Sequence, residues 1–521
     1  MILNELKPTD GRPWASRFDE RSTIYISYFN YCCLAGLRFM HRFASTCFLF
    51  GTSVFLVGCG GDSAVKKSDE PSFAGVALRL SIEKGSPLSE AIRLRVPEWE
   101  ARTGAKVETT EDDVVKTDAD VAVCSGVALA DLAQRRPFSS EFKKKADVGF
   151  VHIPYLHQTA FGARNEATVA IPLAVEQFLL WRRADLFADE KLKTAFEKEF
   201  KAPLAPPKTW EEYVRIASYF QKSKAVKLGC VEAFGDDAEG LQGFFARAAS
   251  FSEDPRSTPF DVTDAHSRLT DPEYHKAAEN LLASLSHSPS AGGKPLTLQK
   301  AREIFAAGDA AMILSPVPPT SHHSLKTAPG FTDKLAVSAL PVSTEVFSGK
   351  AKAWRPRQLK GDAIPAAPYL ATTGYFLSAS ETTTNPAAVE HLIAFLCSTK
   401  DNAYLVQGAR LGLTPAREEM LNDSGRFSGG YGLPGKATAD YFELVRQNLR
   451  PARWATDLRV VDAKAFLKPL GEKLQKAAAG SISATEALQK SHQTWQSEIA
   501  RRGDSFVDEY RMSQGFSKRI K

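Results

Sequence analysis

The stretch "VALRLSIEKGSPLSEAIRLRVPEWEARTGAKVET", residues 76–109, decides the fold class. Apolar residues alternate with small or polar ones from Val76 to Ile82, which is the period of a β-strand. Apolar residues then recur at helical spacing over 88–99, and Gly104 is typical of the position where a helix ends. The residues after this glycine again have the pattern of a strand. A strand, a helix and a strand in this order predict an α/β fold with parallel pairing.

Similar signals continue along the chain. Pro97 lies inside the first predicted helix and is expected to kink or restart it. The charged residues after Arg501 are expected to fray. Three later helices begin with capping signals, in which a side chain satisfies an unpaired backbone N–H group or a proline occupies the first turn. These signals are Thr209 with Glu212, Asn385 with Pro386, and Ser483 with Glu486.

Near the N-terminus, an apolar run ends abruptly at Cys59, behind a basic flank. The run is shorter than the roughly 20 apolar residues that a membrane helix needs, which favours a secretory signal over an uncleaved membrane anchor. The residues from Leu56 to Cys59 resemble the lipobox of bacterial lipoproteins, in which the chain is cut before a cysteine that receives lipid. Residues 1–58 are therefore interpreted as a leader and 59–73 as a tether. A start at Met40 would give a leader of ordinary length.

The composition argues against several classes of protein. The 521 residues carry a net charge of +5 without a basic stripe interleaved with aromatics, so nucleic-acid binding is not expected. Beyond the leader and Cys59, the remaining cysteines, Cys124, Cys230 and Cys397, are scattered, which predicts neither a disulfide framework nor a zinc site. The glycine pattern at Gly430, Gly432 and Gly435 lacks the preceding strand that a dinucleotide site requires. We therefore expect no cofactor, no bound metal and no catalytic set of residues.

Segments along most of the chain resemble, in the same order, family 1 extracellular solute-binding proteins of ABC transporters, which include maltose-binding protein. The most informative segment is "IPLAVEQFLLWRRADLFADE", residues 171–190, which resembles the family's crossover between two lobes. The remaining segments are "PEWEARTGAKVET", "DADVAVCSGVALADLAQR", "PPKTWEEY", "FAAGDAAMIL", "GYFLSASETTTNPAAVEHLIAFL" and "GSISATEALQKSHQTW". Together they extend over about residues 75–500.

The resemblance implies a two-lobed α/β fold of the periplasmic-binding-protein type (type II), with a ligand cleft between lobes joined by hinge crossings. The chain is expected to cross between the lobes near 174–180, 313–318 and 374–380. The implied boundaries are 74–173 and 315–374 for lobe one, 174–314 and 375–500 for lobe two, and 501–521 for a polar tail.

Six residues are expected to contact the ligand. The resemblance implies Glu176, which matches a glutamate that hydrogen-bonds sugar in maltose-binding protein. Glu83 and Ser125 are added because they follow predicted strands. The resemblance also implies Tyr375, Arg410 and Trp454, which lie at or near positions where the family places cleft residues and cleft loops. A carboxylate suits sugar hydroxyls as an acceptor, and an aromatic face suits the apolar side of a pyranose ring. The alternative for Tyr375 and Trp454 is a place in the core, and for Arg410 a pair with a surface acid.

The resemblance implies a monomeric lipoprotein in the periplasm or at the cell surface, anchored to a bacterial membrane by lipid on Cys59. It would capture a solute, expected to be a sugar or oligosaccharide, and deliver it to the permease subunits of an ABC transporter. Because the segment after the predicted strand at 310–314 lacks the tryptophan common in sugar binders, a polyol, a glycan fragment or a charged solute is an alternative ligand. The alternative functions are a lipid-anchored sensor or scaffold, and a glycan-acting enzyme with two acids among Glu83, Glu176 and Asp236.

Overall fold

The computed structural model describes residues that lie within Asp69–Lys521. They are 71–132, 135–142, 163–164, 167–254, 259–321, 326–357, 369–370, 374–398, 413–425, 433–449, 455–456 and 458–513. The predicted leader and Cys59 lie outside these residues, as does the tether up to residue 70. No helix in the described ranges has both the length and the apolar character that a membrane crossing requires.

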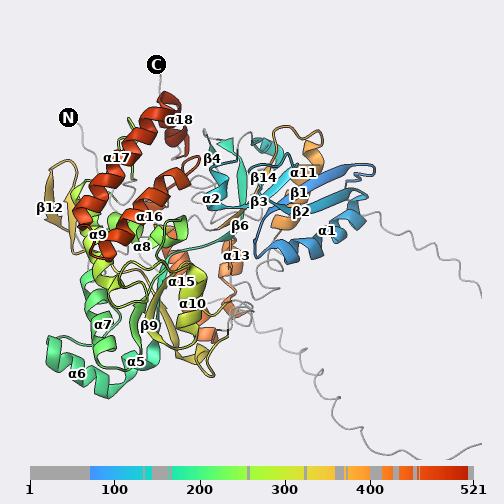
Figure 1. The fold of residues 1–521 in the computed structure, drawn as a ribbon. Helices are drawn as coiled ribbons and strands as arrows, with labels where there is room; N and C mark the ends of the chain where they lie inside the picture. Colours follow the sequence, from blue (N-terminus) through green and yellow to red (C-terminus); the bar gives the residue numbers. More distant parts are fainter. Residues whose placement is uncertain are drawn as a thin grey trace, which may run out of the picture. The chain divides into compact units, whose positions relative to one another are not determined.

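The first sheet has six strands in the order β15-β6-β14-β3-β1-β2 (Figure 1). Strand β1 pairs in parallel with both β2 and β3, whereas β14 is antiparallel to β3 and to β6. Strand β15 is antiparallel to β6. The strands are β1 (Ala77–Glu83), β2 (Lys106–Asp112), β3 (Val121–Ser125), β6 (Ala170–Val175), β14 (Tyr375–Ala379) and β15 (Thr414–Pro415).

The second sheet has four strands in the order β10-β7-β9-β8. Strand β7 is antiparallel to both of its neighbours, and β8 is parallel to β9. The strands are β7 (Leu179–Arg183), β8 (Leu228–Val231), β9 (Ala310–Ser315) and β10 (Leu335–Ser338). Three two-stranded ladders complete the described strands: β4 (Ala163–Arg164) with β5 (Ala167–Thr168), β11 (Glu345–Ser348) with β12 (Ala353–Pro356), and β13 (Tyr369–Leu370) with β16 (Ala455–Thr456).

Helices pack on both sheets. The helices associated with the first sheet are α1 (Ser89–Thr103), α2 (Gly126–Leu129), α11 (Pro386–Cys397) and α13 (Glu418–Leu421). Those associated with the second sheet are α5 (Ala184–Ala188), α6 (Glu190–Phe200), α7 (Trp210–Lys222), α8 (Ala238–Phe251), α9 (Pro272–Leu285), α10 (Leu298–Ala306), the 3-10 turn η1 (Thr332–Lys334), α15 (Gly435–Leu449), α16 (Lys464–Ala478), α17 (Ala484–Arg502) and α18 (Asp504–Ser513). Helices α16 and α17 pack beside α9 although they are far from it in sequence (Figure 1).

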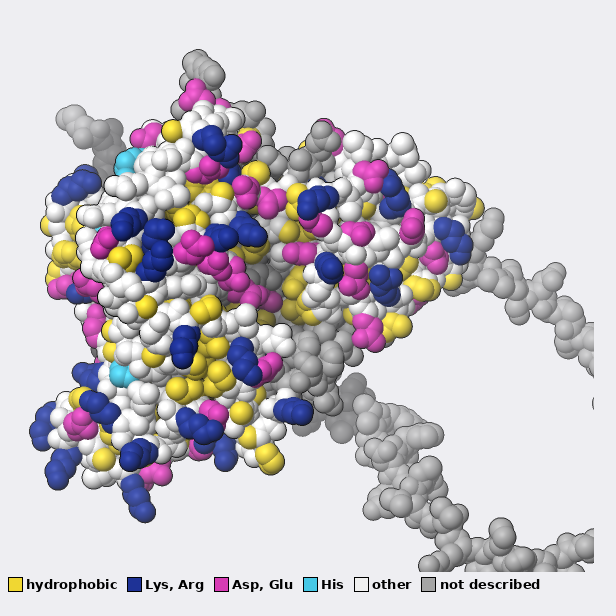
Figure 2. All heavy atoms as spheres, in the orientation of Figure 1, with side chains coloured by type: hydrophobic (Ala, Val, Ile, Leu, Met, Phe, Trp, Pro, Cys, Tyr) yellow, Lys and Arg dark blue, Asp and Glu magenta, His cyan; other side chains and the backbone are white. Residues whose placement is uncertain are grey.

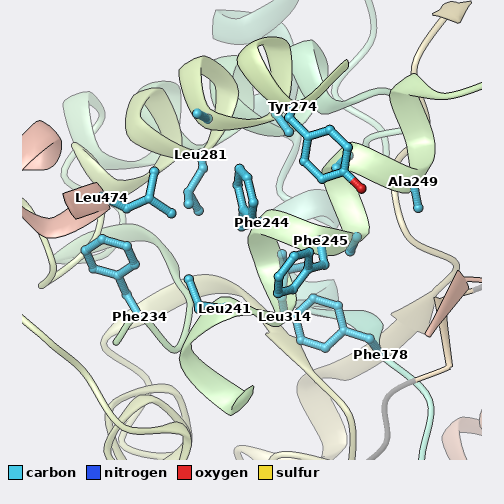
Figure 3. Close-up of a cluster of buried hydrophobic side chains, with 14 of the residues drawn as sticks. Phe178, Phe234, Leu241, Phe244, Phe245, Ala249, Tyr274, Leu281, Leu314 and Leu474 are labelled. Carbon is cyan, nitrogen blue, oxygen red and sulfur yellow. The ribbon is translucent and has the colours of Figure 1, made fainter. Parts of the chain in front are cut away.

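Some strands, such as β6 and β9, are buried on both faces, and side chains of one strand can enter different cores. In β7, Leu179 and Trp181 belong to a cluster that continues into the first sheet, whereas Leu180 belongs to the core beneath α7, α8 and α9. Figure 3 shows the α8 side of this second core, where aromatic and aliphatic side chains from several elements meet. Alternation along β7 thus determines which of the two cores each of these apolar side chains enters.

Several local predictions are confirmed. The strands expected within 76–109 are β1 and β2, and Thr209 with Glu212 forms both hydrogen bonds of a capping box at α7. Pro386 occupies the first turn of α11, but the Asn385 side chain donates or accepts no capping bond there. At α17, the Ser483 hydroxyl accepts the Glu486 N–H group.

Helix α1 continues through Pro97 from Ser89 to Thr103, which excludes the restart, one of the two outcomes expected there. The prediction for the end of the chain is wrong. The residues after Arg501, expected to fray, form α18, whose Phe506, Val507 and Tyr510 are buried. These apolar residues recur at helical spacing and enter the same core as α16 and α17, which stabilises a segment that looked polar by its charge content.

The sheet memberships correct the predicted lobe boundaries. The predicted crossing near 174–180 agrees with the passage from β6 in the first sheet to β7 in the second. However, β10 lies within 315–374 and belongs to the second sheet, and β14 lies within 375–500 and belongs to the first. The chain therefore stays with the second sheet beyond 313–318 and returns to the first before Tyr375. Short apolar strands look alike in sequence, because periodicity does not encode which partner they pair with.

Candidate functional site

Four of the predicted ligand residues lie at one edge of the first sheet. Glu83 and Ser125 are the last residues of β1 and β3, and Glu176 directly follows β6. Because β14 runs antiparallel to β3 and β6, its first residue, Tyr375, lies at the edge where those strands end. Tyr375 is the direct ladder partner of both Ser125 and Ala174. In α/β sheets, the carboxyl ends of parallel strands are the usual position for a ligand site.

Glu83 and Ser125 are joined by hydrogen bonds between neighbouring strand ends. The Ser125 hydroxyl donates to Glu83 Oε1 at 3.0 Å, and the Ser125 backbone N–H group donates to the other carboxylate oxygen. The same serine hydroxyl accepts the N–H group of Ala128 and so caps α2. A carboxylate has about four lone-pair sites, so these two donors leave further acceptor sites on its oxygens.

The position of Tyr375 depends on the glycine before it. A Cβ atom on Gly374 would lie 2.7 Å from the Ala174 carbonyl oxygen, so a larger residue would push β14 away from β6. The Gly374 carbonyl oxygen also accepts the Gly126 N–H group at 2.8 Å. The ladder between β14 and β6 shifts register between Tyr375 and Phe376. The close approach of Gly374 to Ala174 and the shift in register therefore determine the position of Tyr375 at the start of β14.

Tyr375 is partly exposed, and acidic side chains surround its phenol. Burial raises the pKa of Tyr375 well above its ordinary value, and Glu176, Glu83 and Glu239 raise it further, in that order. A hydrogen bond with the Ser86 side chain acts in the opposite direction. The phenol therefore stays protonated at neutral pH and can donate a hydrogen bond.

Glu176 is 6% exposed and lies where the chain passes from the first sheet to the second. The next residue, Gln177, is fixed by a backbone hydrogen bond to the Pro316 carbonyl and by a side-chain bond to the Val445 carbonyl. Nearby, the Tyr441 phenol and the Thr414 hydroxyl share a buried hydrogen bond, and Glu176 helps to raise the pKa of Tyr441 above its ordinary value. The carboxylate is thus held by a well-anchored segment.

Arg302 on α10 brings a positive charge to this group. Burial lowers the pKa of Arg302 to about 10, while Glu176 and Glu239 act against that shift. Its Nη2 atom donates to the Ser321 carbonyl at 3.0 Å and to the Pro318 carbonyl at 3.3 Å. The arginine therefore organises the segment after β9 and lies within electrostatic reach of carboxylates from two different elements.

Sequence reasoning missed Ser86, Glu239 and Arg302. For Arg302 a signal existed, since helical spacing from Leu298 and Phe305, both buried, places it toward the core side of α10. No comparable signal marks Glu239, which lies in the first turn of α8 where acidic residues are common. Arg410 and Trp454 lie outside the described residues.

The group thus contains three carboxylates, a protonated phenol, a serine pair and one buried guanidinium. It can accept hydrogen bonds from several hydroxyls at once and donate to others. Asp236, the further acid of the enzymatic alternative, lies in the loop before α8, where its backbone packs against Gly471. Among the described residues no cluster of three or more His, Cys, Asp or Glu side chains is arranged to hold a metal ion.

Solved structures support the fold. The matches include MalE3 of T. maritima with maltose bound, with 16% identity, a TM-score of 0.59, and coverage of 81% of this chain and 100% of that chain. An ABC transporter solute-binding protein from Agrobacterium radiobacter with ribitol matches with 18% identity and a TM-score of 0.59, covering 82% and 100%. One from Agrobacterium vitis with D-mannitol matches with 15% identity and a TM-score of 0.58, covering 82% and 99%. These likenesses confirm the predicted two-lobed α/β fold.

A protein-family model described as bacterial extracellular solute-binding protein matches residues 100–427. No curated protein matches the sequence significantly. The family match covers more than half of the chain and includes the crossing at Glu176 and the start of β14. On this basis, the chain belongs to the bacterial extracellular solute-binding protein family.

Proposed function

We propose that this solute-binding protein captures a carbohydrate or polyol and delivers it to the permease of an ABC transporter, without chemical conversion of the solute. The observation that carries the proposal is the meeting of Glu83, Ser125, Glu176 and Tyr375 at one sheet edge, within electrostatic reach of Arg302 and Glu239. Family membership supports an extracytoplasmic location.

The chemistry of these groups suits a ligand with many hydroxyls. Each hydroxyl donates one hydrogen bond and accepts others, so it pairs with carboxylates as a donor and with a phenol or guanidinium as an acceptor. The exposed part of the Tyr375 ring offers an apolar face to a sugar ring. The three similar structures named above hold maltose, ribitol and D-mannitol, which are all polyhydroxylated.

Binding would be coupled to closure of the two lobes. Glu83 and Tyr375 belong to the first sheet, Arg302 and Glu239 to helices of the second, and Glu176 to the passage between them. A ligand that contacts both groups binds the closed arrangement better than an open one, and so shifts the population toward it. The closed form would then be the one that a permease recognises.

The test is calorimetric titration of the purified protein with maltose, D-mannitol and ribitol, with aspartate as a control of another chemical class. We expect saturable binding of at least one polyhydroxylated compound and none of aspartate. At a hundredfold excess over Kd, binding would stabilise the folded state by about 2.7 kcal/mol. Chromatography of the incubated ligand should recover it unchanged. Binding of aspartate alone would overturn the carbohydrate class, and a new product would overturn the receptor role.

We also propose that Cys59 carries the lipid that anchors the protein. The apolar run before this cysteine and the small residues around it support a lipoprotein signal. The expected result is incorporation of labelled palmitate and recovery in the membrane fraction, both lost in Cys59→Ala. Equal palmitate labelling of the variant would contradict this assignment.

A further inference from the structure

Gln242 on α8 is a buried amide without internal partners. Its side chain belongs to a residue that is 1% exposed, and neither the amide nitrogen nor the amide oxygen finds a hydrogen-bond partner among the described residues. A buried amide normally has partners, because removing it from water without replacing its hydrogen bonds is unfavourable. The position of Gln242 in the fold should therefore explain why these two amide atoms lack partners.

The helical period places Gln242 on the same stripe of α8 as Glu239, the exposed residue of the first turn that acts electrostatically on the candidate site. It lies three residues after Glu239, whose charge acts on both Tyr375 and Arg302, and three residues before Phe245. Residues three apart share one side of a helix. Figure 3 shows Phe245 directed toward Phe178, which follows Glu176 and Gln177 in the passage between the sheets. Gln242 thus lies between a residue that acts electrostatically on the site and a residue that faces the passage beside Glu176.

The next residue along α8, about 100° further round the helix, packs against internal contacts. A Cβ atom on Gly243 would lie 2.9 Å from Glu232 Oε2 and 3.1 Å from Arg247 Nη1, so that side of the helix packs against an ion pair. Both Glu232 and Arg247 already have partners in each other. The amide of Gln242 is therefore not explained by the polar network of the second core.

We infer that Gln242 hydrogen-bonds the captured solute and contributes to specificity for adjacent hydroxyls. A neutral amide offers one acceptor and two donors side by side, so it can accept from one hydroxyl and donate to the next. A carboxylate at this position would only accept. The inference rests on the proposed function and adds a second contact from α8 to the residues already assigned to the site.

The test compares Gln242→Met with wild type. Methionine keeps the length and the helix-forming tendency of glutamine but removes both polar atoms. We expect the affinity for the probe that wild type binds best among maltose, D-mannitol and ribitol to fall about tenfold to a hundredfold, as loss of about two hydrogen bonds implies. The melting temperature without ligand should stay the same or rise, because an unsatisfied amide has been removed.

Ser290→Ala is the matched control, because the Ser290 hydroxyl is also buried without a partner in the described part of the chain but lies after α9, away from the site. It should leave affinity unchanged. Unchanged affinity in Gln242→Met would overturn the inference, and so would a clear fall in its melting temperature, which would show that the amide is paired within the protein. If wild type binds none of the probes, the proposed carbohydrate function fails. The melting temperature of Gln242→Met would then still show whether the amide has a hydrogen-bond partner within the protein.

Discussion

Two glutamates occupy equivalent places in the two sheets and have different surroundings. Glu176 follows β6 in the first sheet, Glu232 follows β8 in the second, and they are 6% and 1% exposed. Both oxygens of Glu232 accept from Arg247, at 2.9 and 2.8 Å. Glu176 acts electrostatically on Tyr375, Arg302 and Tyr441, which come from separate elements. Residue type and topological position are shared, so the partners decide whether such a carboxylate serves stability or recognition.

The Glu232 pair is embedded in a wider network. The Arg247 guanidinium also donates to Asn280 Oδ1 at 2.9 Å and to Ser284 Oγ at 3.0 Å, and it lies 4.3 Å from the Trp210 ring centroid. Each nitrogen of the Arg247 guanidinium therefore has a hydrogen-bond partner inside the core. A network of this kind fixes α8 against β8 and α9, and so holds the helix that carries Glu239 and Gln242.

The largest effect is expected from breaking that pair. Glu232→Ala leaves the Arg247 charge buried without its carboxylate and should lower the free energy of unfolding by about 3–5 kcal/mol. Urea denaturation followed by circular dichroism measures this loss. The double variant Glu232→Met with Arg247→Met removes both charges and should recover most of it. A loss below about 1 kcal/mol in Glu232→Ala would show that the two glutamates do not differ as described.

The second effect is on binding. Glu176→Gln keeps the shape of the side chain but removes the charge, and should weaken binding of the preferred sugar or polyol by about 1.5–3 kcal/mol, the range for a hydrogen bond to a charged group. The free energy of unfolding should change by less than about 1 kcal/mol. Calorimetric titration and urea denaturation on one preparation give both numbers. The exposed Glu381 is the control, since Glu381→Gln should change neither. Loss of stability without loss of affinity would show that Glu176, like Glu232, serves stability rather than recognition.

A smaller effect is expected at Tyr375. Tyr375→Phe removes only the phenol hydroxyl, so affinity should fall by about 0.5–1.5 kcal/mol while the ring and the start of β14 remain. Because the pKa of Tyr375 lies well above its ordinary value, wild-type binding should not weaken through tyrosine ionisation between pH 7 and pH 10. Titrations across this pH range check the claim. A wild-type affinity that falls near pH 9 and a flat profile in Tyr375→Phe would contradict it.

The smallest effect belongs to a carboxylate with two cationic partners near the surface. The Arg501 guanidinium, with Arg502 beside it, lowers the pKa of Glu498 from 4.5 to about 2. The folded state therefore keeps the carboxylate ionised at lower pH than the unfolded state, and the stabilisation is present above pH 4.5 and lost between pH 4.5 and about 2. Glu498→Gln should cost about 0.5–1 kcal/mol at pH 7, as exposed pairs do.

Urea denaturation at pH 7 and at pH 3, with and without added salt, tests this last prediction. The difference between Glu498→Gln and wild type should shrink at the lower pH and in high salt. A difference as large as that of Glu232→Ala would show that the number of cationic partners, rather than burial, sets the energy of these carboxylates.

The face of the molecule drawn in Figure 2 agrees with the balanced composition. Figure 2 shows basic and acidic side chains interspersed over the visible face, without a large field of one sign. The near-neutral charge that argued against nucleic-acid binding in the sequence is therefore also distributed evenly on this face.

Much of the local structure and part of the candidate site could be predicted from sequence. Period-two alternation identified β1, and strand ends directed attention to Glu83, Ser125 and Tyr375, which the structure brings to one edge. The division into lobes could not be predicted in the same way. Strands β10 and β14 have similar apolar patterns, and only pairing with β7 and with β3 assigns them to different sheets.

The sequence by itself determined the elements, the α/β class and the residue types available at strand ends, because these depend on neighbours a few positions apart. The groups that surround each carboxylate depend instead on how distant segments pack. Glu232 meets Arg247 from the adjacent helix and Asn280 behind it, whereas Glu176 meets influences from α10, α15 and β14, far along the chain. The energy of a buried charge depends on the groups that surround it in space, and periodicity along the chain carries no information about them.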